Sequence, residues 1–227
     1  MSALLPNSPI VVGTIHSHAA LREALRLKPG AVDLLELRVD HFAADLDSLR
    51  RAVPKLRMPL IVTVRHPREG GAGHLTNRER ARLFAEFLPC ASFIDVEVRS
   101  IAALDATLKA ARAQKIGIIV SAHYFKTTPS LATLRARRNE ARKARPDIFK
   151  IATLASKPAH FATLLSFLTS AKNSPALSVM GMGGFGKISR LALARAGSAL
   201  NYGYLGDAQL PGQWPAVELK RRLQELA

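Results

Sequence analysis

The chain has 227 residues, of which 48% are hydrophobic and 22% charged, and Lys plus Arg exceed Asp plus Glu by 33 to 17, giving a net charge of +16. This length suits one domain, the apolar fraction excludes a disordered chain, and no apolar run reaches the roughly 18–20 residues that span a bilayer. The single cysteine, Cys90, excludes an internal disulfide framework and, with an N-terminal segment that lacks a signal-peptide pattern, predicts a cytoplasmic protein.

Short β-rich runs alternate with segments of helical periodicity along the whole chain. The expected strands cover residues 10–15, 32–38, 60–65, 93–98, 116–121, 148–152, 177–180 and 199–203. The expected helices lie near residues 18–27, 45–53, 76–88, 100–114, 130–145, 157–171, 187–196 and 215–226. Thr76 precedes Glu79 at capping-box spacing, and Ser100 is the expected start of the helix that ends at Gln114.

This strict alternation predicts the fold class. Eight strands that alternate with eight helices imply a parallel sheet with right-handed crossovers, and closing that sheet gives a (β/α)8 barrel. Such a barrel takes about 200–250 residues or more, so we predict an α/β protein with a single (β/α)8 TIM barrel as the one catalytic domain over residues 1–227. An open doubly wound sheet is the structural rival.

The segment Gly181 to Gly186, GMGGFG, favours that rival because it satisfies the G-x-G-x-x-G pattern of dinucleotide-binding folds. The fingerprint requires an acidic residue at the end of the next strand, where this chain has Asn201. We therefore interpret the glycines as a flexible strand-to-helix loop.

The positive charge is densest in residues 135–145 and 220–222, and both blocks lie in expected helices that have apolar residues on the opposite face. We interpret them as solvated helix faces. A basic nucleic-acid-binding module is the non-enzyme alternative, but it rests on net charge alone and no nucleic-acid motif accompanies the charge. We do not expect nucleic acid to be a partner.

Polar residues recur where the expected strands end, which is where barrel enzymes carry their active sites. In chain order they are Glu36, Arg38 and Asp40; Arg65, His66 and Glu69; Asp95 and Glu97; Ser121 and His123; Lys150; Met182, Lys187 and Arg190; and Gln209 and Gln213. Taken singly, each has a structural interpretation, such as an interior ion pair of Glu36 with Arg38 or a core histidine at position 123. Their recurrence at the same end of many strands predicts a site at the barrel mouth.

Lys150 suggests the chemistry of this site. It stands in the run Asp-Ile-Phe-Lys-Ile-Ala, where apolar neighbours favour a neutral, nucleophilic amine. A neutral lysine beside a ketone forms a Schiff base, and His123 on the preceding strand is suited to move protons near neutral pH. Glu69 is a candidate to orient that imidazole, and the arginines suit a substrate that carries a carboxylate.

These residues lie in motifs that resemble the type I 3-dehydroquinate dehydratases of the shikimate pathway. The matching segments are ELRVDHF, TVRHPREGG, SAHYF, DIFKIA, MGGFGKISR, GSALNYG and PGQ, in order from Pro9 to Gln213. The resemblance implies a (β/α)8 barrel, usually a homodimer, that needs no metal or organic cofactor and converts 3-dehydroquinate to 3-dehydroshikimate and water in aromatic amino acid biosynthesis. The same step serves quinate breakdown, and the motifs do not distinguish the two roles.

The resemblance also implies roles for individual residues. Lys150 would form the imine, His123 would act as general base and then as general acid, and Glu69 would be the partner of His123. The expected substrate-binding residues are Thr14, Glu36, Arg38, Arg65, Met182, Arg190, Gln209 and Gln213. Among them, Glu36, Arg38 and Arg65 would hold ring hydroxyls, and Arg190 and Gln213 would bind the carboxylate. The segment 205–213 would form a lid.

The departures from the family pattern are Gln209-Leu210 and Thr14, which stands where a serine often contributes. Two features of the sequence leave alternatives open. Gln209 and Leu210 replace the usual Ser-Ala before PGQ, which leaves a family member of changed activity as one alternative. His16 and His18 form an H-x-H pair at the end of the first strand, which leaves a metal-dependent amidohydrolase barrel as another. The later metal ligands of that class are missing, so we expect no metal.

Overall fold

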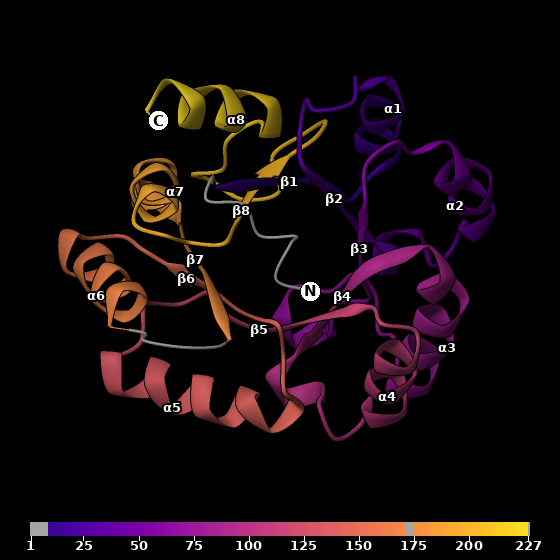
Figure 1. Cartoon of the computed structure of the whole chain (residues 1–227), viewed down its shortest axis with the longest axis horizontal. Helices are drawn as coiled ribbons and strands as arrows, with labels where there is room; N and C mark the ends of the chain where they lie inside the picture. The colour runs from indigo at the N-terminus through magenta and orange to yellow at the C-terminus, as the bar shows by residue number, and fades with distance from the viewer. Residues whose placement is uncertain (1–8, 171–174, 227) are drawn as a thin grey trace.

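The computed structural model describes residues 9–170 and 175–226, and its centre is a sheet of eight parallel strands (Figure 1). The strands are β1 (Ile10–Ile15), β2 (Leu34–Arg38), β3 (Leu60–Thr63), β4 (Ala91–Glu97), β5 (Gly117–Tyr124), β6 (Ile148–Leu154), β7 (Ala176–Met182) and β8 (Leu200–Tyr204). Neighbours along the chain pair with each other, and β8 pairs with β1, so the order is β7-β6-β5-β4-β3-β2-β1-β8. This topology excludes the doubly wound alternative, whose strand order reverses at a switch point.

The seam between β7 and β8 is bridged by hydrogen bonds that bring the sheet close to a complete barrel. The Ala199 amide donates to the Leu177 carbonyl oxygen at 2.7 Å, and the Ser178 hydroxyl donates to the Leu200 carbonyl oxygen at 2.6 Å. The predicted (β/α)8 barrel is therefore confirmed as a nearly closed barrel, with its helices arranged around the outside (Figure 1).

The helices follow the predicted order, with small differences at their ends. They are α1 (His18–Arg26), α2 (Leu46–Ala52), α3 (Asn77–Phe87), α4 (Asp105–Ala113), α5 (Leu131–Ala141), α6 (Pro158–Thr169), α7 (Gly186–Arg195) and α8 (Ala216–Glu225). The capping box of Thr76 and Glu79 is present at the start of α3. The expected start at Ser100 is wrong, because Ser100 ends a 3-10 turn and its hydroxyl donates to Glu97 instead of capping a helix. Residue 171, the last of another expected helix, lies outside the described residues.

Residues alternate between two cores along each strand, since successive side chains point to opposite faces. One set packs against the helices, and the other fills the barrel with an apolar floor. Ile10, Val12, Leu34, Ile61, Phe93, Ile119, Ile148, Met180, Leu200 and Tyr202 are among the buried residues of that floor. Toward the carboxyl ends of the strands the inward positions turn polar, so the upper end of the barrel carries the polar groups.

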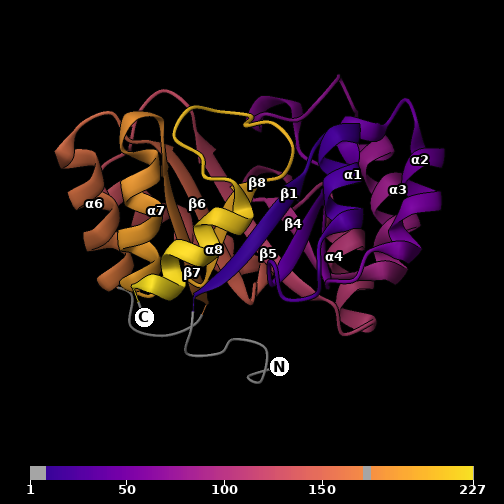
Figure 2. The ribbon, with the colours of Figure 1, turned by 90° about the horizontal axis from the view of Figure 1, so that it is seen from above.

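The loop that follows β8 arches over this upper end (Figure 2), and the glycine-rich segment after β7 supports it. The Gly183 amide donates to the Pro211 carbonyl oxygen at 3.0 Å, and a Cβ at Gly186 would collide with the Gly212 carbonyl oxygen. The expected strand-to-helix connection is correct. Its glycines permit close backbone packing against the loop over the mouth, in addition to the positive φ of 76° at Gly183.

The second basic block, residues 220–222, lies only in part on an exposed helix face, since the Lys220 side chain is 18% exposed and its Nζ pairs with Asp33 at 2.8 Å. On α8, Arg221 and Arg222 pair with Glu218 and Glu225 at 2.7–3.2 Å. Exposed pairs of this kind contribute little to stability but compensate part of the local charge. Within residues 9–170 and 175–226, no helix combines the length and the apolar character that crossing a membrane would require.

Candidate active site

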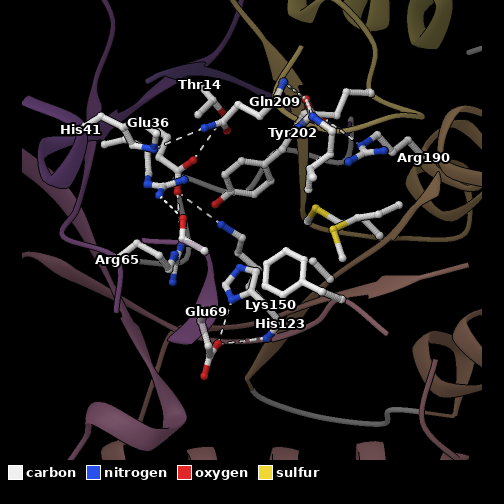
Figure 3. A pocket seen from close by; sticks show the side chains of 18 residues that line it. Thr14, Glu36, His41, Arg65, Glu69, His123, Lys150, Arg190, Tyr202 and Gln209 are labelled. Atoms are coloured by element: carbon white, nitrogen blue, oxygen red, sulfur yellow. Dashed lines mark hydrogen bonds and ion pairs between the residues drawn. The ribbon is translucent and has the colours of Figure 1, made fainter. Parts of the chain in front are cut away.

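A cavity of about 220 Å³ opens at the carboxyl ends of the strands, beneath the loop that follows β8 (Figure 3). It is lined by every residue to which the family resemblance gave a role: Thr14, Glu36, Arg38, Arg65, Glu69, His123, Lys150, Met182, Arg190, Gln209 and Gln213. The other polar residues at strand ends do not line it: Asp40, His66, Asp95, Glu97, Ser121 and Lys187. His41, Gly70, Phe125, Ala152, Met180, Tyr202 and Leu210 complete the wall. The residues come from the ends of seven strands, all but β4, or from the segments beyond them, because parallel strands bring their carboxyl ends to one edge.

Lys150 lies on the floor of this cavity and is only 4% exposed. Its Nζ donates to Asp95 Oδ2 at 2.9 Å and to Glu36 Oε1 at 3.3 Å. The expectation of apolar surroundings for this amine is therefore wrong: the alternation of the strand turns Phe149 and Ile151 outward, and two carboxylates from β2 and β4 contact the nitrogen. This pairing holds a positively charged nitrogen in place.

Arg65 binds the same carboxylates from the β3 side. It contacts Asp95 at 2.8 and 3.1 Å and Glu97 at 3.0 Å, and its Nη2 lies 3.6 Å from Glu36 Oε1. Burial alone would raise the pKa of the Asp95 carboxyl, but Arg65 and Lys150 outweigh that effect and hold it well below its usual range. Arg65 thus belongs to a buried ion network, and most of the hydrogen bonds of its guanidinium are made within that network.

A second arginine completes this network from outside the barrel. Arg80 extends inward from α3 and is fully buried, with Nη2 2.5 Å from Glu97 Oε2 and Nε donating to the Val64 carbonyl oxygen. Three cations, Lys150, Arg65 and Arg80, therefore contact three carboxylates, Glu36, Asp95 and Glu97. Such balance is what keeps buried charges tolerable, since an unpaired buried ion costs several kcal/mol.

Arg38 holds the loop that carries Glu69. Its guanidinium binds Asp40 with two hydrogen bonds, at 3.0 and 2.8 Å, and donates to the Gly70 carbonyl oxygen at 2.8 Å. Asp40 in turn accepts from the backbone amides of Arg65 and Ala72. Arg38 lines the cavity as expected, and its hydrogen bonds to Asp40 and Gly70 connect β2 with the loop after β3.

His123 and Glu69 form a hydrogen-bonded pair on one wall. Glu69 Oε2 lies 2.9 Å from His123 Nδ1 and accepts from the His123 backbone amide at 3.0 Å, while Arg99 Nε donates to Oε1 at 3.0 Å. These three donors favour the carboxylate form of Glu69, so Nδ1 carries the proton and Nε2 of the ring is free to accept one.

Burial shifts the pKa of both partners. Desolvation, followed by the nearby Arg65 and Lys150, lowers the pKa of His123 well below its ordinary value and leaves the ring neutral at neutral pH. Desolvation, followed by the Glu97 carboxylate, raises the pKa of Glu69 to about 7, against the opposing effect of Arg65 and Arg99. A neutral imidazole with an oriented Nε2 is suited to act as a general base.

Arg190 lies across the cavity from this pair and has a different environment (Figure 3). It is 3% exposed, and its Nε and Nη1 donate to the carbonyl oxygens of Tyr202, Gly181, Gly186 and Gly212. No carboxylate among the described residues pairs with it, and desolvation lowers its pKa to about 10. A buried cation without a counter-ion, lining a cavity, is suited to bind an anionic group.

The loop after β8 covers the cavity beside Arg190. Gln213 Oε1 accepts from the backbone amides of Gln209 and Leu210 at 2.8 and 3.2 Å, which leaves its side-chain NH₂ as the donor available to a ligand. Gln209 reaches across the mouth to His41, with 3.5 Å between the two Nε2 atoms, and Leu210 packs on the apolar residues of the barrel interior. The departure from Ser-Ala thus places a larger apolar side chain in the wall.

His16 and His18 do not form a metal-binding pair. The His18 ring packs edge-on against Phe42, and its Nε2 lies 3.5 Å from Asp45, whereas the His16 ring faces His41. Across the part of the chain that the structure describes, no three His, Cys, Asp or Glu side chains come together in a way that could hold a metal ion.

Sequence reasoning gave no role to several residues that shape the site. Asp95, Glu97 and Ser121 appeared only as polar residues at strand ends, and Arg80 and Tyr202 were not considered. The alternation of β4 and β8 could have identified Asp95 and Tyr202 as inward-facing, because each follows a floor residue, Phe93 or Leu200, at a spacing of two. No local signal marks Arg80 on α3, whose partner Glu97 lies 17 residues away at the end of β4.

Together, the fold and the cavity define a (β/α)8-barrel enzyme with a lysine, a neutral histidine and an unpaired arginine at the mouth. Comparison with known proteins gives the family. The profile of the Type I 3-dehydroquinase family matches residues 9–227. A curated 3-dehydroquinate dehydratase of Thermodesulfovibrio yellowstonii is 32% identical over 213 residues, covering 92% of each chain, and a catabolic 3-dehydroquinate dehydratase of Acinetobacter baylyi is 31% identical over 204 residues, covering 85% of this chain and 75% of the other.

Solved structures agree. The type I 3-dehydroquinate dehydratase of Clostridium difficile, with covalently modified comenic acid, superposes with a TM-score of 0.86 at 26% identity and covers 98% of this chain and 93% of its own. The enzyme of Geobacillus kaustophilus gives a TM-score of 0.84 at 29% identity, covering 97% and 91%. The chain belongs to the type I 3-dehydroquinase family. It is a 3-dehydroquinate dehydratase, a lyase of the shikimate pathway that leads to aromatic amino acids.

Proposed function

We propose that this chain dehydrates 3-dehydroquinate through a Schiff base at Lys150. The Lys150 ammonium gives a proton to His123 Nε2, and the neutral amine adds to the ketone carbon. The proton returns to the former carbonyl oxygen, which leaves as water, and the protonated imine that results withdraws electrons from the neighbouring carbon. A protonated imine keeps the positive charge at Nζ. The carboxylates of Asp95 and Glu36, at 2.9 and 3.3 Å from that nitrogen, therefore stabilise the intermediate as well as the free ammonium.

His123 moves the protons in this proposal. Its Nε2 takes the proton from the carbon next to the imine, and the electron pair forms a new double bond as the C1 hydroxyl leaves. The same nitrogen returns its proton to that hydroxyl, which departs as water, and a second water releases the product from Lys150. Glu69 keeps Nδ1 protonated and the ring oriented throughout.

The substrate carboxylate would bind at Arg190 and Gln213. Arg190 offers a buried positive charge without a carboxylate partner, and Gln213 offers its side-chain NH₂. Thr14, Glu36, Arg38, Arg65, Met182 and Gln209 would complete the binding surface around the ring. Because Arg38, Arg65 and Glu36 are already bonded to protein groups, we propose that they act on substrate hydroxyls while keeping these contacts.

The observation that carries the proposal is that Lys150 and His123, on adjacent strands β6 and β5, line the same cavity as the unpaired Arg190. This arrangement supplies a nucleophile, a base and an anion-binding group around one small ligand.

Intact mass spectrometry after borohydride reduction tests the proposal. We expect a substrate-dependent mass increase in the wild type and none in Lys150→Ala, which should also lose turnover by about 10⁴-fold or more because the covalent route is removed. His123→Ala should retain some adduct but turn over slowly. Retained turnover in a folded Lys150→Ala variant would contradict the imine route.

We also propose that the chain acts as one catalytic domain, as a homodimer and in the cytoplasm, without a cofactor. Ile188 on α7 and Val217 on α8 are 60% and 42% exposed, which supports an apolar contact between copies. The single cysteine, Cys90, is compatible with a reducing compartment. Light scattering on the wild type and on Ile188→Glu would test the dimer, and a monomeric wild type would refute it.

A further inference from the structure

Tyr202 presents a buried hydroxyl that the proposed roles do not use. The residue lies near the carboxyl end of β8, lines the cavity and is 5% exposed. Within residues 9–170 and 175–226, its hydroxyl oxygen is buried and has no hydrogen-bond partner. Buried hydroxyl groups normally have a partner, and leaving one without a partner is unfavourable. A buried hydroxyl without a protein partner in the wall of an active-site cavity is therefore suited to bind a ligand.

The position of this hydroxyl relative to Lys150 suggests that use. Lys150 Nζ lies 3.8 Å from the centroid of the Tyr202 ring, and the phenol points into the cavity toward Lys150 and Glu36 (Figure 3). Nearby carboxylates already have their own donors: Glu36 accepts from Thr14, Thr63 and Lys150, and Asp95 accepts from Arg65, Ser121 and Lys150. The Tyr202 ring is thus adjacent to the nucleophile, and its hydroxyl is not paired with the ion network around Lys150.

The hydroxyl is a donor under all working conditions. Desolvation, followed by Glu36 and Asp95, raises the pKa of Tyr202 well above its ordinary value, with Arg65 opposing. The phenol therefore keeps its proton and is neutral.

We propose that the Tyr202 hydroxyl donates a hydrogen bond to the carbonyl oxygen of 3-dehydroquinate, at the carbon that Lys150 attacks. When the nitrogen adds to that carbon, the carbonyl electrons move onto the oxygen, and a preorganised donor stabilises the charge that develops there. The oxygen must lie next to Nζ because both atoms bond to the same carbon, and Tyr202 is the cavity residue whose ring contacts Nζ.

Other donors near Lys150 are less suited to this oxygen. Arg65 Nη1 and Nη2 are bonded to Asp95, Glu97 and Ser121. His123 contributes Nε2, which acts as an acceptor in the proposed proton transfer. The inference rests on the proposed Lys150 imine and adds a catalytic group that acts on the substrate oxygen during its formation.

Tyr202→Phe is the sharpest test because it removes the hydroxyl and keeps the ring over Lys150. We expect kcat/KM for 3-dehydroquinate to fall by about 5- to 100-fold, the range for losing a hydrogen bond to an oxygen that gains charge. Formation of the borohydride-trapped adduct, followed by rapid quenching, should slow by a similar factor with KM little changed. The melting temperature should stay the same or rise, since no protein hydrogen bond is lost.

Tyr204→Phe is the matched control, because Tyr204 lies on the same strand but does not line the cavity. An adduct that forms in Tyr202→Phe at the wild-type rate would overturn the inference about Tyr202 and leave the imine standing. The absence of an adduct in the wild type would overturn both. A raised KM with unchanged adduct formation would overturn the assignment to the carbonyl oxygen, and a clear loss of stability would show that the hydroxyl has a structural partner.

Discussion

The two sides of the cavity differ in how their polar groups are satisfied. On the side formed by β2 to β6, Lys150, Arg65 and Arg80 contact Glu36, Asp95 and Glu97, so that buried positive and negative charges balance. On the side formed by β7 and β8, the described residues offer neither a carboxylate partner to Arg190 nor a hydrogen bond to the Tyr202 hydroxyl.

This difference separates groups that the protein holds for itself from groups that it keeps for a ligand. A balanced network fixes side chains in one arrangement, because moving any member leaves a buried charge unpaired. An unpaired cation and an unpartnered donor cost stability in the free protein and are compensated when a ligand supplies the carboxylate and the oxygen. The first side therefore orients the reacting nitrogen, and the second recognises the substrate.

Asp95→Asn should disrupt the buried ion network and produce the largest loss of stability. The substitution keeps the shape but leaves Arg65 and Lys150 with one negative charge fewer, and disrupting a buried ion pair costs about 3–5 kcal/mol. For a chain of this size we expect the melting temperature to fall by roughly 6–20 °C. Calorimetry would measure the change.

The low pKa of Asp95 gives a second way to examine the same group. Because the folded-state pKa lies below the unfolded value, Asp95 stabilises the protein above about pH 4, and this contribution is lost as the pH falls further. The difference in unfolding free energy between the wild type and Asp95→Asn should therefore become smaller in acid. Asp105→Asn, which breaks the exposed pair with Lys109, is the control and should cost less than about 1 kcal/mol. Equal effects of the two substitutions would contradict the network.

Arg190→Ala should weaken binding of the substrate carboxylate, with a smaller effect than the Asp95 substitution. A charge-assisted hydrogen bond contributes about 1.5–3 kcal/mol, so KM for 3-dehydroquinate should rise by roughly 10- to 150-fold with a smaller change in kcat. Steady-state kinetics would measure both constants. Arg190→Lys separates charge from packing, and Arg195→Ala at the exposed end of α7 is the control. A KM that does not change in Arg190→Ala would contradict the carboxylate assignment.

Arg99→Ala should produce the smallest effect. It tests whether the charge of Arg99 helps to keep Glu69 ionised beside His123. The pKa of Glu69 is about 7, so kcat/KM should decline as the pH falls through 7 and the carboxylate that orients His123 is protonated. Arg99 lowers that pKa, and removing it should move the acid limb to higher pH by less than about one unit because Arg99 is 43% exposed. Arg99→Lys should return the acid limb of the pH profile to its wild-type position. If the acid limb does not move in Arg99→Ala, Arg99 has no effect on the pKa of Glu69.

Much of the fold could be predicted because its signals are local. Alternating apolar runs and helical segments identified all eight strands, and the capping box marked the start of α3 at Thr76. Helix ends were less accurate where the signal was a single residue. Ser100 has a capping side chain, yet it donates to Glu97 and accepts from Arg80, so a tertiary contact replaced the cap.

The sequence by itself determined that this protein is a barrel with a lysine, a histidine and an arginine at the carboxyl ends of its strands, because strand alternation and strand ends can be recognised along the chain. Only the tertiary structure decided which inward side chains meet. Lys150 contacts Asp95 and Glu36, which lie 55 and 114 residues away, in place of the apolar neighbours that its own strand suggested. Barrel closure brings β2, β4, β6 and β8 to one level, and that proximity determines the charge of each group, its partners and the donors left for a substrate.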